Sequence, residues 1–204
     1  MQITSGIRRI LSHPVAYSGF QYLMGAHRGW LRITRDYISA KPGDAILDLG
    51  CGPGDLLRYL PKVEYWGFDV SPKYIERAKR TFKSLGNFRC KLFEDSDLPL
   101  LPKFDVVLLS GVLHHLDDGE AGRICSLARR ALKTGGRLVT IDPCLVPGQN
   151  FVARYLIGKD RGQNVRNEMG YRALAAEHFD SVQIDVVNKS WIPYTHCFMI
   201  CTRT

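Results

Sequence analysis

The sequence contains no apolar run of the roughly 20 residues that a helix needs to cross a bilayer. Residues 1–9 also lack the apolar stretch and the small-residue cleavage site of a secretory signal. The six cysteines are scattered, with no C-x-x-C pair and no histidine at zinc-finger spacing. Internal repeats and low-complexity segments are missing as well. These absences argue against a membrane-spanning, disulfide-stapled or repeat protein, and we expect a cytoplasmic protein with reduced thiols and no metal site.

The composition is that of an ordinary globular protein. The 204 residues are 24% charged and 45% hydrophobic, and a chain of this length can bury one full-sized core. We therefore expect a single domain over residues 1–204. The pattern along the chain indicates a helical N-terminal segment (1–40), a core (41–142), an insert (143–170) and a closing segment (171–204).

Short apolar strands alternate with helices through the core. The expected strands span residues 45–49, 64–69, 88–93, 104–109 and 138–141, and the expected helices span 55–60, 71–85 and 118–132. Strands that alternate with helices at this spacing form a parallel sheet that is covered on both faces. A last helix (171–179) and two strands (182–187 and 196–202), close enough to pair antiparallel, complete a mostly parallel sheet of seven strands.

Local signals fix some of the helix ends. Ser71 and Pro72 suit the N-cap and the first position of the helix that follows them. Gly135 and Gly136 are expected to end the helix before them. Two more helices are expected at residues 3–11 and 21–38, and with the partly helical insert they would form a helical cap on the sheet.

A glycine-rich loop follows the first strand. Gly50, Gly52 and Gly54 are spaced G-x-G-x-G between a strand and a helix. Glycine allows a positive φ and lets a ligand approach the backbone closely. In open α/β sheets a ligand lies beyond the carboxyl ends of the strands, next to such a loop. The pattern alone is equally compatible with a tight strand-to-helix turn.

Acidic residues follow the next two strands. Asp69 ends the second strand, where a carboxylate can accept the hydroxyls of a bound ribose. Its alternative role is turn chemistry ahead of Ser71. Glu94 and Asp95 follow the third strand, where a carboxylate can accept a hydrogen bond from an adenine amino group; a solvated acidic loop is the alternative. Acceptors at three successive strand ends favour a nucleoside-containing ligand.

The segment Ile46-Leu47-Asp48-Leu49-Gly50-Cys51-Gly52-Pro53-Gly54 closely resembles motif I of the class I S-adenosylmethionine-dependent methyltransferases. The resemblance continues in order through residues 67–71, 94–99, 104–107, 110–116 and 132–138, and it covers roughly residues 41–142. It implies a Rossmann-like fold in which residues 41–142 bind the cofactor and residues 143–170 face the substrate. An NAD-dependent dehydrogenase is the nearest alternative, but it would prefer G-x-G-x-x-G, and position 55 is Asp.

The resemblance implies S-adenosylmethionine as the cofactor and S-adenosylhomocysteine as its product. By the same resemblance, the methionine portion would contact Asp48, Gly50, Cys51, Gly52 and Gly54, the ribose Asp69 and Val70, the adenine Glu94 or Asp95, and the sulfonium region Ser110. The reaction would be direct displacement at the methyl carbon, for which the protein mainly aligns the acceptor and excludes water.

Two histidines, His114 and His115, follow the fourth strand, next to the expected methyl group. A hydroxyl acceptor benefits from a base, and we favour His115 for this role. One of the pair is expected to be a packed structural histidine. Residues 110–113 read Ser-Gly-Val-Leu, where aminomethylating branches of the family carry Asn/Asp-Pro-Pro-Tyr/Phe. This difference favours methylation of oxygen over methylation of a base amine or a glutamine amide.

The positive charge is concentrated outside the core. Residues 1–41 contain six basic residues and one acid, and residues 143–172 contain five and two. We interpret these segments as a cap that binds a small or lipid-linked anionic acceptor; the alternative is a solvated basic face. The candidate substrate residues are Tyr17, Tyr22, Arg161, Arg166, Tyr171, Tyr194 and His196.

Other functions stay open at this point. An RNA methyltransferase fits the basic charge, although the chain has no appended RNA-binding module. A non-catalytic sensor of S-adenosylmethionine would keep the binding motifs without turnover. The amphipathic segment from Ile3 to Leu11 suits peripheral contact with an anionic membrane at the inner face. Residues 149–171 and 192–196 also resemble methyltransferases of bacterial surface-polysaccharide or lipid-linked sugar gene regions. The oligomeric state is not predicted.

Overall fold

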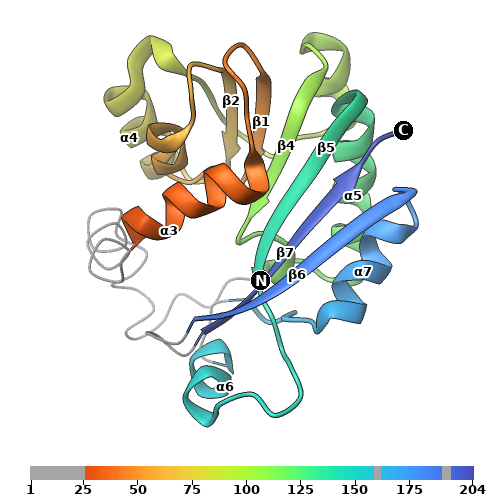
Figure 1. Ribbon diagram of the computed structural model, residues 1–204. Helices are drawn as coiled ribbons and strands as arrows, with labels where there is room; N and C mark the ends of the chain where they lie inside the picture. Colours follow the sequence, from red (N-terminus) through yellow and green to blue (C-terminus); the bar gives the residue numbers. More distant parts are fainter. Residues whose placement is uncertain (1–25, 159–161, 190–193) are drawn as a thin grey trace.

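The fold is built on a twisted sheet with helices on both faces (Figure 1). The computed structural model describes residues 26–158, 162–189 and 194–204. In this part of the chain, seven strands lie in the order β3-β2-β1-β4-β5-β7-β6, and β7 runs in the opposite direction to the other six. Their bounds are β1 Ala45–Leu49, β2 Glu64–Asp69, β3 Asn87–Cys90, β4 Phe104–Ser110, β5 Leu132–Pro143, β6 Ser181–Lys189 and β7 Tyr194–Thr202. The predicted Rossmann-like, mostly parallel sheet is confirmed.

The strand order creates a switch point beside β1. The chain leaves β1 towards β2 and β3 on one side, and it returns to β4 and β5 on the other. The loops after β1 and β4 therefore diverge and leave a crevice at the carboxyl edge of the sheet. Both the glycine loop and the two histidines lie at this edge.

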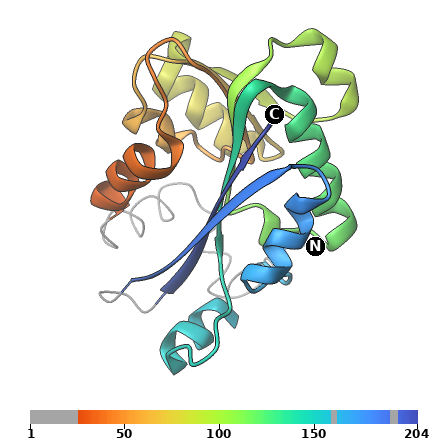
Figure 2. The same ribbon diagram turned by 45° about the vertical axis from the view of Figure 1, so that its right-hand side comes forward.

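Helices cover the two faces of the sheet with separate apolar clusters (Figure 2). The described helices are α3 Ala26–Ile33, α4 Pro72–Phe82, α5 Asp118–Ala131, α6 Phe151–Gly158 and α7 Glu168–Ala176. The helices α5 and α7 pack on the face that carries Leu47 and Leu109. The helix α4 and the turn after α3 pack on the face that carries Ile46 and Leu108. None of the helices in the described ranges has the length and apolar character to cross a bilayer.

Side-chain caps explain where several helices begin. The Ser71 hydroxyl accepts the Tyr74 N–H at 3.4 Å, and Pro72 occupies the first turn of α4, as predicted. Asp117 caps α5 by accepting the Glu120 N–H at 2.9 Å. Asn167 caps α7, which therefore begins at Glu168 and not at residue 171 as predicted.

Further expectations differ from the structure at element boundaries. The helix expected at 55–60 is a 3-10 turn, Asp55–Tyr59, and the strand expected at 88–93 ends at Cys90. The helix before Gly135 ends at Ala131, where Leu132 already pairs with β4. Gly135 lies inside β5 at a register shift between the two strands, which explains its φ of +77°. The helix expected at 21–38 is described from Ala26, and its last turn, Thr34–Ile38, is a π-helix.

Candidate cofactor and acceptor site

The glycine loop after β1 adopts a backbone that only glycine tolerates easily. Gly50, Gly52 and Gly54 have φ values of +76°, +55° and +74°, in the region that side chains with a Cβ rarely adopt. A Cβ on Gly50 would lie 2.6 Å from Cγ2 of Val112, so Gly50 allows the loop after β4 to close against this loop. A Cβ on Gly52 would meet no atom within 4 Å, so Gly52 borders open space.

Asp69 ties the end of β2 to this loop. Its Oδ2 accepts the Gly52 N–H at 2.9 Å, and its Oδ1 accepts the Ser71 N–H at 2.8 Å. Burial raises the pKa of the carboxyl above its usual value. Each carboxylate oxygen has a second lone pair. Asp69 therefore stabilises the turn, as the alternative interpretation held, and its carboxylate can still accept hydrogen bonds from ligand hydroxyls.

Asp48 is a buried carboxyl group directly before the loop. Its residue is only 2% exposed, and Oδ2 accepts a hydrogen bond of 2.5 Å from the Tyr65 hydroxyl. Its Oδ1 is buried and has no hydrogen-bond partner among the described residues. Burial raises the pKa of Asp48 to about 7. An unpartnered buried acceptor of this kind is costly, and it fits a ligand that brings a cationic donor such as an amino group.

Cys51 and Val70 are two further predicted cofactor residues near the end of β2. The Cys51 sulfur is packed on Gly67, where a Cβ would come within 2.8 Å of it. Burial raises the pKa of the Cys51 thiol, so it stays protonated. Val70 is 60% exposed immediately after β2. Cys51 is therefore a packing residue of the loop, and Val70 offers an apolar surface beside it.

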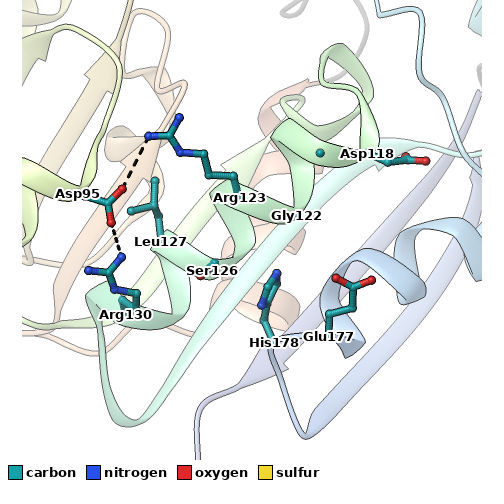
Figure 3. Close-up of a pocket in the computed structure, with 10 residues that line it drawn as sticks. Asp95, Asp118, Gly122, Arg123, Ser126, Leu127, Arg130, Glu177 and His178 are labelled. Atoms are coloured by element: carbon teal, nitrogen blue, oxygen red, sulfur yellow. Dashed lines mark hydrogen bonds and ion pairs between the residues drawn. The ribbon is translucent and has the colours of Figure 1, made fainter.

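Asp95 is turned towards α5 and bonds to two arginines (Figure 3). It accepts a hydrogen bond from Arg130 and lies 3.7 Å from the Arg123 guanidinium. The ion pair with Arg130 lowers the pKa of Asp95. These side chains border a shallow cavity of about 360 Å³ that runs over the exposed side of α5 to His178. The sequence left Glu94 and Asp95 as alternatives. Their side chains are similarly exposed, at 54% and 53%, so it is the pairing of Asp95 with the two arginines that favours Glu94.

A buried histidine–aspartate pair joins the ends of β4 and β5. His114 is 4% exposed, and its Nδ1 lies 2.8 Å from Oδ1 of Asp142. The same oxygen accepts the His114 backbone N–H at 3.2 Å. Sequence reasoning missed Asp142. Its position in the sequence could have indicated the pair, because Asp142 follows the fifth expected strand and the histidines follow the fourth.

His115 lies beside this pair and is half-buried. Its ring centroid is 4.1 Å from that of His114, at an angle of 38° between the planes. Val112, three residues earlier, is the side chain that faces Gly50. Ser110 ends β4 opposite Ile141, and the next N–H, from Gly111, is donated to the Ile141 carbonyl at 2.7 Å. The glycine loop, the end of β4 and the two histidines therefore form one continuous region.

The insert packs directly on His114 through a glycine that sequence reasoning missed. A Cβ on Gly162 would lie 2.0 Å from Cδ2 of His114, so only glycine fits there. The Asn164 N–H is donated to the His114 carbonyl at 2.9 Å. A lone glycine in a long insert gives no sequence signal for such a contact.

Arg166 has a different place from the one predicted. Its guanidinium donates to the carbonyls of Leu113, Leu116 and Asn164 at 2.8–2.9 Å, and it pairs with Asp118 at 2.7 Å. Its side chain is 11% exposed. The guanidinium therefore anchors the insert to the loop after β4 and is not placed to bind substrate, because these acceptors occupy its donors.

The predicted substrate tyrosine Tyr171 is also a core residue. It is 1% exposed, and its hydroxyl donates to the Pro143 carbonyl at 2.9 Å. Tyr194 and His196, by contrast, lie side by side on β7, with ring centroids 4.9 Å apart. His196 pairs with Pro143 at the carboxyl end of β5. Tyr17, Tyr22 and Arg161 fall outside the described residues.

We expect Arg166→Ala to lower the free energy of unfolding by about 2–3 kcal/mol, since it leaves buried carbonyl groups without a donor. Arg32→Ala is the matched control, because Arg32 is 63% exposed and pairs with Asp36 on the surface; surface pairs contribute about 0–1 kcal/mol. Urea unfolding of both variants measures the difference. Equal losses would show that Arg166 is not the anchor described above.

The strand order, the glycine loop and the carboxylates at the ends of β1 and β2 define an α/β enzyme that binds a nucleoside-containing cofactor. Residues 47–138 match the sequence-family model of a methyltransferase domain. A 2-phytyl-1,4-naphtoquinone methyltransferase of Synechococcus elongatus is 30% identical over 182 residues, which cover 81% of this chain and 77% of the relative. The chain belongs to the class I S-adenosylmethionine-dependent methyltransferases, and S-adenosylmethionine is its methyl donor.

Two further proteins are similar, each over a smaller share of its own length. The 27-O-demethylrifamycin SV methyltransferase of Amycolatopsis mediterranei is 36% identical over 115 residues, which cover 52% of this chain and 41% of the relative. Human N-acetylserotonin methyltransferase, solved in complex with SAM, has a TM-score of 0.66 at 20% identity, covering 96% of this chain and 58% of that one. Depending on the relative, the chain spans between 35% and 77% of its length.

Proposed function

We propose that this enzyme transfers the methyl group to an oxygen atom of a small or lipid-linked acceptor that carries negative charge. The observation that supports the acceptor side is the cluster of His115, His114 and Asp142 at the ends of β4 and β5. It adjoins the glycine loop through the contact between Val112 and Gly50. Methylation of an oxygen requires the acceptor hydroxyl to lie beside the methyl group, and it benefits from a base at the same position.

The cofactor contacts that we propose follow from the geometry of three strand ends. Asp48 supplies the buried Oδ1 for the amino group of the methionine portion, and Gly52 supplies open space beside it. Asp69 supplies lone pairs for the ribose hydroxyls, and the exposed Val70 an apolar surface next to the nucleoside. The proposed contacts at the remaining positions are with Gly50, Cys51, Gly54, Glu94 and Ser110.

Bound S-adenosylmethionine supplies an activated methyl group on a sulfonium. The protein then has to align the acceptor oxygen with the methyl carbon and keep water away. Where the acceptor is a hydroxyl, His115 would take the proton that its oxygen loses on methylation. The Asp142–His114 pair holds the neighbouring ring in place. Tyr194 and His196 line the acceptor side from β7.

The named relatives support a small or lipid-tailed acceptor. Their names describe a phytyl naphthoquinone and a demethylated rifamycin oxygen as the groups that those proteins methylate. The excess of basic residues at 1–41 and 143–172 supports an anionic group on the acceptor. Arg166 does not contribute to that support, since its guanidinium holds the insert. Arg161 stays a proposed contact.

Transfer of a radiolabelled methyl group into a fractionated cell lysate tests the proposal. We expect label in the lipid or small-molecule fraction, in a product that is stable to nuclease. Label in nuclease-sensitive material would contradict the proposal and favour methylation of RNA. Cofactor binding without label in any fraction of a lysate from the source organism would contradict it in favour of a non-catalytic sensor.

We expect Gly52→Ala to weaken S-adenosylmethionine binding about tenfold or more, because the added methyl group enters the open space of the loop. The positive φ adds a stability loss of about 1–2 kcal/mol. Gly135→Ala is the matched control, because Gly135 also has a positive φ, of +77°, and a Cβ there also meets nothing within 4 Å. Gly135 lies near the start of β5, at the end of the strand opposite to the site. Calorimetric titration and thermal unfolding separate the two effects. Unchanged affinity in Gly52→Ala would place the cofactor elsewhere.

A further inference from the structure

The short helix α6 exposes apolar side chains that the sheet does not use. Phe151 is 81% exposed, Tyr155 56%, Val152 48% and Leu156 36%. Scattered exposed apolar residues are ordinary on protein surfaces, but contiguous ones mark an interaction site. Four on one eight-residue helix are contiguous. We call these four residues the α6 face.

The geometry of the helix puts the four side chains on one side. Successive residues on an α-helix are about 100° apart, so Phe151, Tyr155, Val152 and Leu156 follow one another around an arc of about 140°. Ala153 and Ile157 lie outside this arc and are 3% and 2% exposed, so they attach the helix to the body of the protein. The α6 face therefore points away from the part of the protein on which Ala153 and Ile157 pack.

The helix lies at the acceptor end of the enzyme. It follows β5 and projects beyond the carboxyl ends of β4 and β5, beside the first residues of β7 (Figures 1 and 2). Gln149, just before the helix, donates to the Thr195 hydroxyl of β7 at 2.8 Å and to the Cys144 carbonyl at 3.0 Å. A binding partner of the α6 face would therefore lie next to the region of His115, Tyr194 and His196.

The charge around the α6 face selects its partner. The helix contains no acidic residue, and the exposed Arg154 lies on the flank of the apolar arc. The sequence that follows is Lys159-Asp160-Arg161, and the chain as a whole carries a net charge of +8. Like charge opposes pairing of two copies. An apolar helix face flanked by cations fits the surface of an anionic lipid bilayer.

We propose that the α6 face inserts into the interfacial layer of an anionic membrane and so brings the acceptor site to a lipid-linked acceptor. Phe151, Val152, Tyr155 and Leu156 enter the acyl boundary, and Arg154 meets the lipid phosphates. The statement that membrane contact brings a lipid-linked acceptor to the site rests on the proposed function. The contact itself does not, because binding to vesicles can be measured without an acceptor.

Vesicle flotation of the full chain tests the contact. We expect the protein to float with vesicles of phosphatidylcholine and phosphatidylglycerol, and to float less with phosphatidylcholine alone or at high salt, because each cation near the anionic surface strengthens partitioning about fivefold. Phe151→Ser/Tyr155→Ser should weaken flotation roughly tenfold or more. Arg154→Gln should weaken it about fivefold on the anionic vesicles only.

Leu85→Ser/Leu100→Ser is the matched control, because these side chains are 67% and 69% exposed elsewhere on the molecule. It should float as the unchanged protein does. All variants should bind S-adenosylmethionine with unchanged affinity, which shows that they are folded. The methyl-transfer assay is separate, so failure of the proposed acceptor class and failure of membrane contact give different results.

Three results would overturn the inference. The first is no flotation of the unchanged protein with anionic vesicles. The second is flotation that survives Phe151→Ser/Tyr155→Ser but is lost in Ile7→Ser/Ile10→Ser, which would assign the contact to the N-terminal segment. The third is a dimer in sedimentation that Phe151→Ser/Tyr155→Ser converts to a monomer, which would make the α6 face an interface between two copies.

Discussion

Asp69→Ala is expected to weaken S-adenosylmethionine binding about a thousandfold. The two ribose hydroxyls would each lose a hydrogen bond to a charged acceptor, and such bonds contribute about 1.5–3 kcal/mol each. The loop would also lose the acceptor for the Gly52 N–H, which Asp69 holds at 2.9 Å. Calorimetric titration with S-adenosylmethionine measures the loss directly.

A second variant separates the ribose contact from the loop contact. Asp69→Asn keeps one neutral acceptor oxygen, so it should retain part of the loop contact and bind the cofactor with intermediate affinity. Asp95→Ala is the control, because Asp95 pairs with Arg130 and Arg123 on the α5 surface. It should bind normally. Normal affinity in Asp69→Ala would overturn the placement of the cofactor at the end of β2.

His115→Ala is expected to lower kcat about a hundredfold while the affinity for S-adenosylmethionine is unchanged. A positioned base contributes at least this much to a reaction in which the acceptor must lose a proton. His115 is half-buried beside the His114–Asp142 pair. A pH profile of the single-turnover rate should also lose the limb that reports the protonation state of the base.

His178→Ala is the control for this effect, because His178 is also half-buried but lies by the cavity over α5. Asp142→Asn probes the neighbouring pair. It should slow transfer less than His115→Ala, because Asp142 acts by holding His114, and not by touching the acceptor. An unchanged rate in His115→Ala would remove His115 from the reaction.

The sheet was predictable because its signals are local. Each strand is a short apolar run, and the βα alternation allows few arrangements other than a parallel sheet. The boundaries were less predictable because tertiary contacts decide them. Leu132 illustrates this: it pairs with Phe104 and ends α5 before the glycines that the sequence suggests as the end. Asn167 likewise starts α7 earlier than the apolar pattern indicates.

The cofactor loop was predictable for the same reason, since Gly50, Gly52 and Gly54 report a backbone requirement within one short segment. The acceptor side was not, because its geometry depends on partners distant in sequence. Arg166 and Tyr171 have the residue types of a substrate site, yet their donors are used by backbone carbonyls. Asp142 and Gly162 carry no motif, and their roles appear only when the insert meets the loop after β4.

The anchoring of the insert also bears on how the enzyme can change its substrate. The N–H of Leu145 is donated to the carbonyl of Arg166 at 3.1 Å, so the two ends of the segment between them meet. A loop whose two ends already touch can be exchanged for one of another length at little entropic cost. Evolution or a protein engineer can thus graft a new segment between these two residues, and with it a new acceptor, while the sheet and the methyl-donor pocket are inherited unaltered.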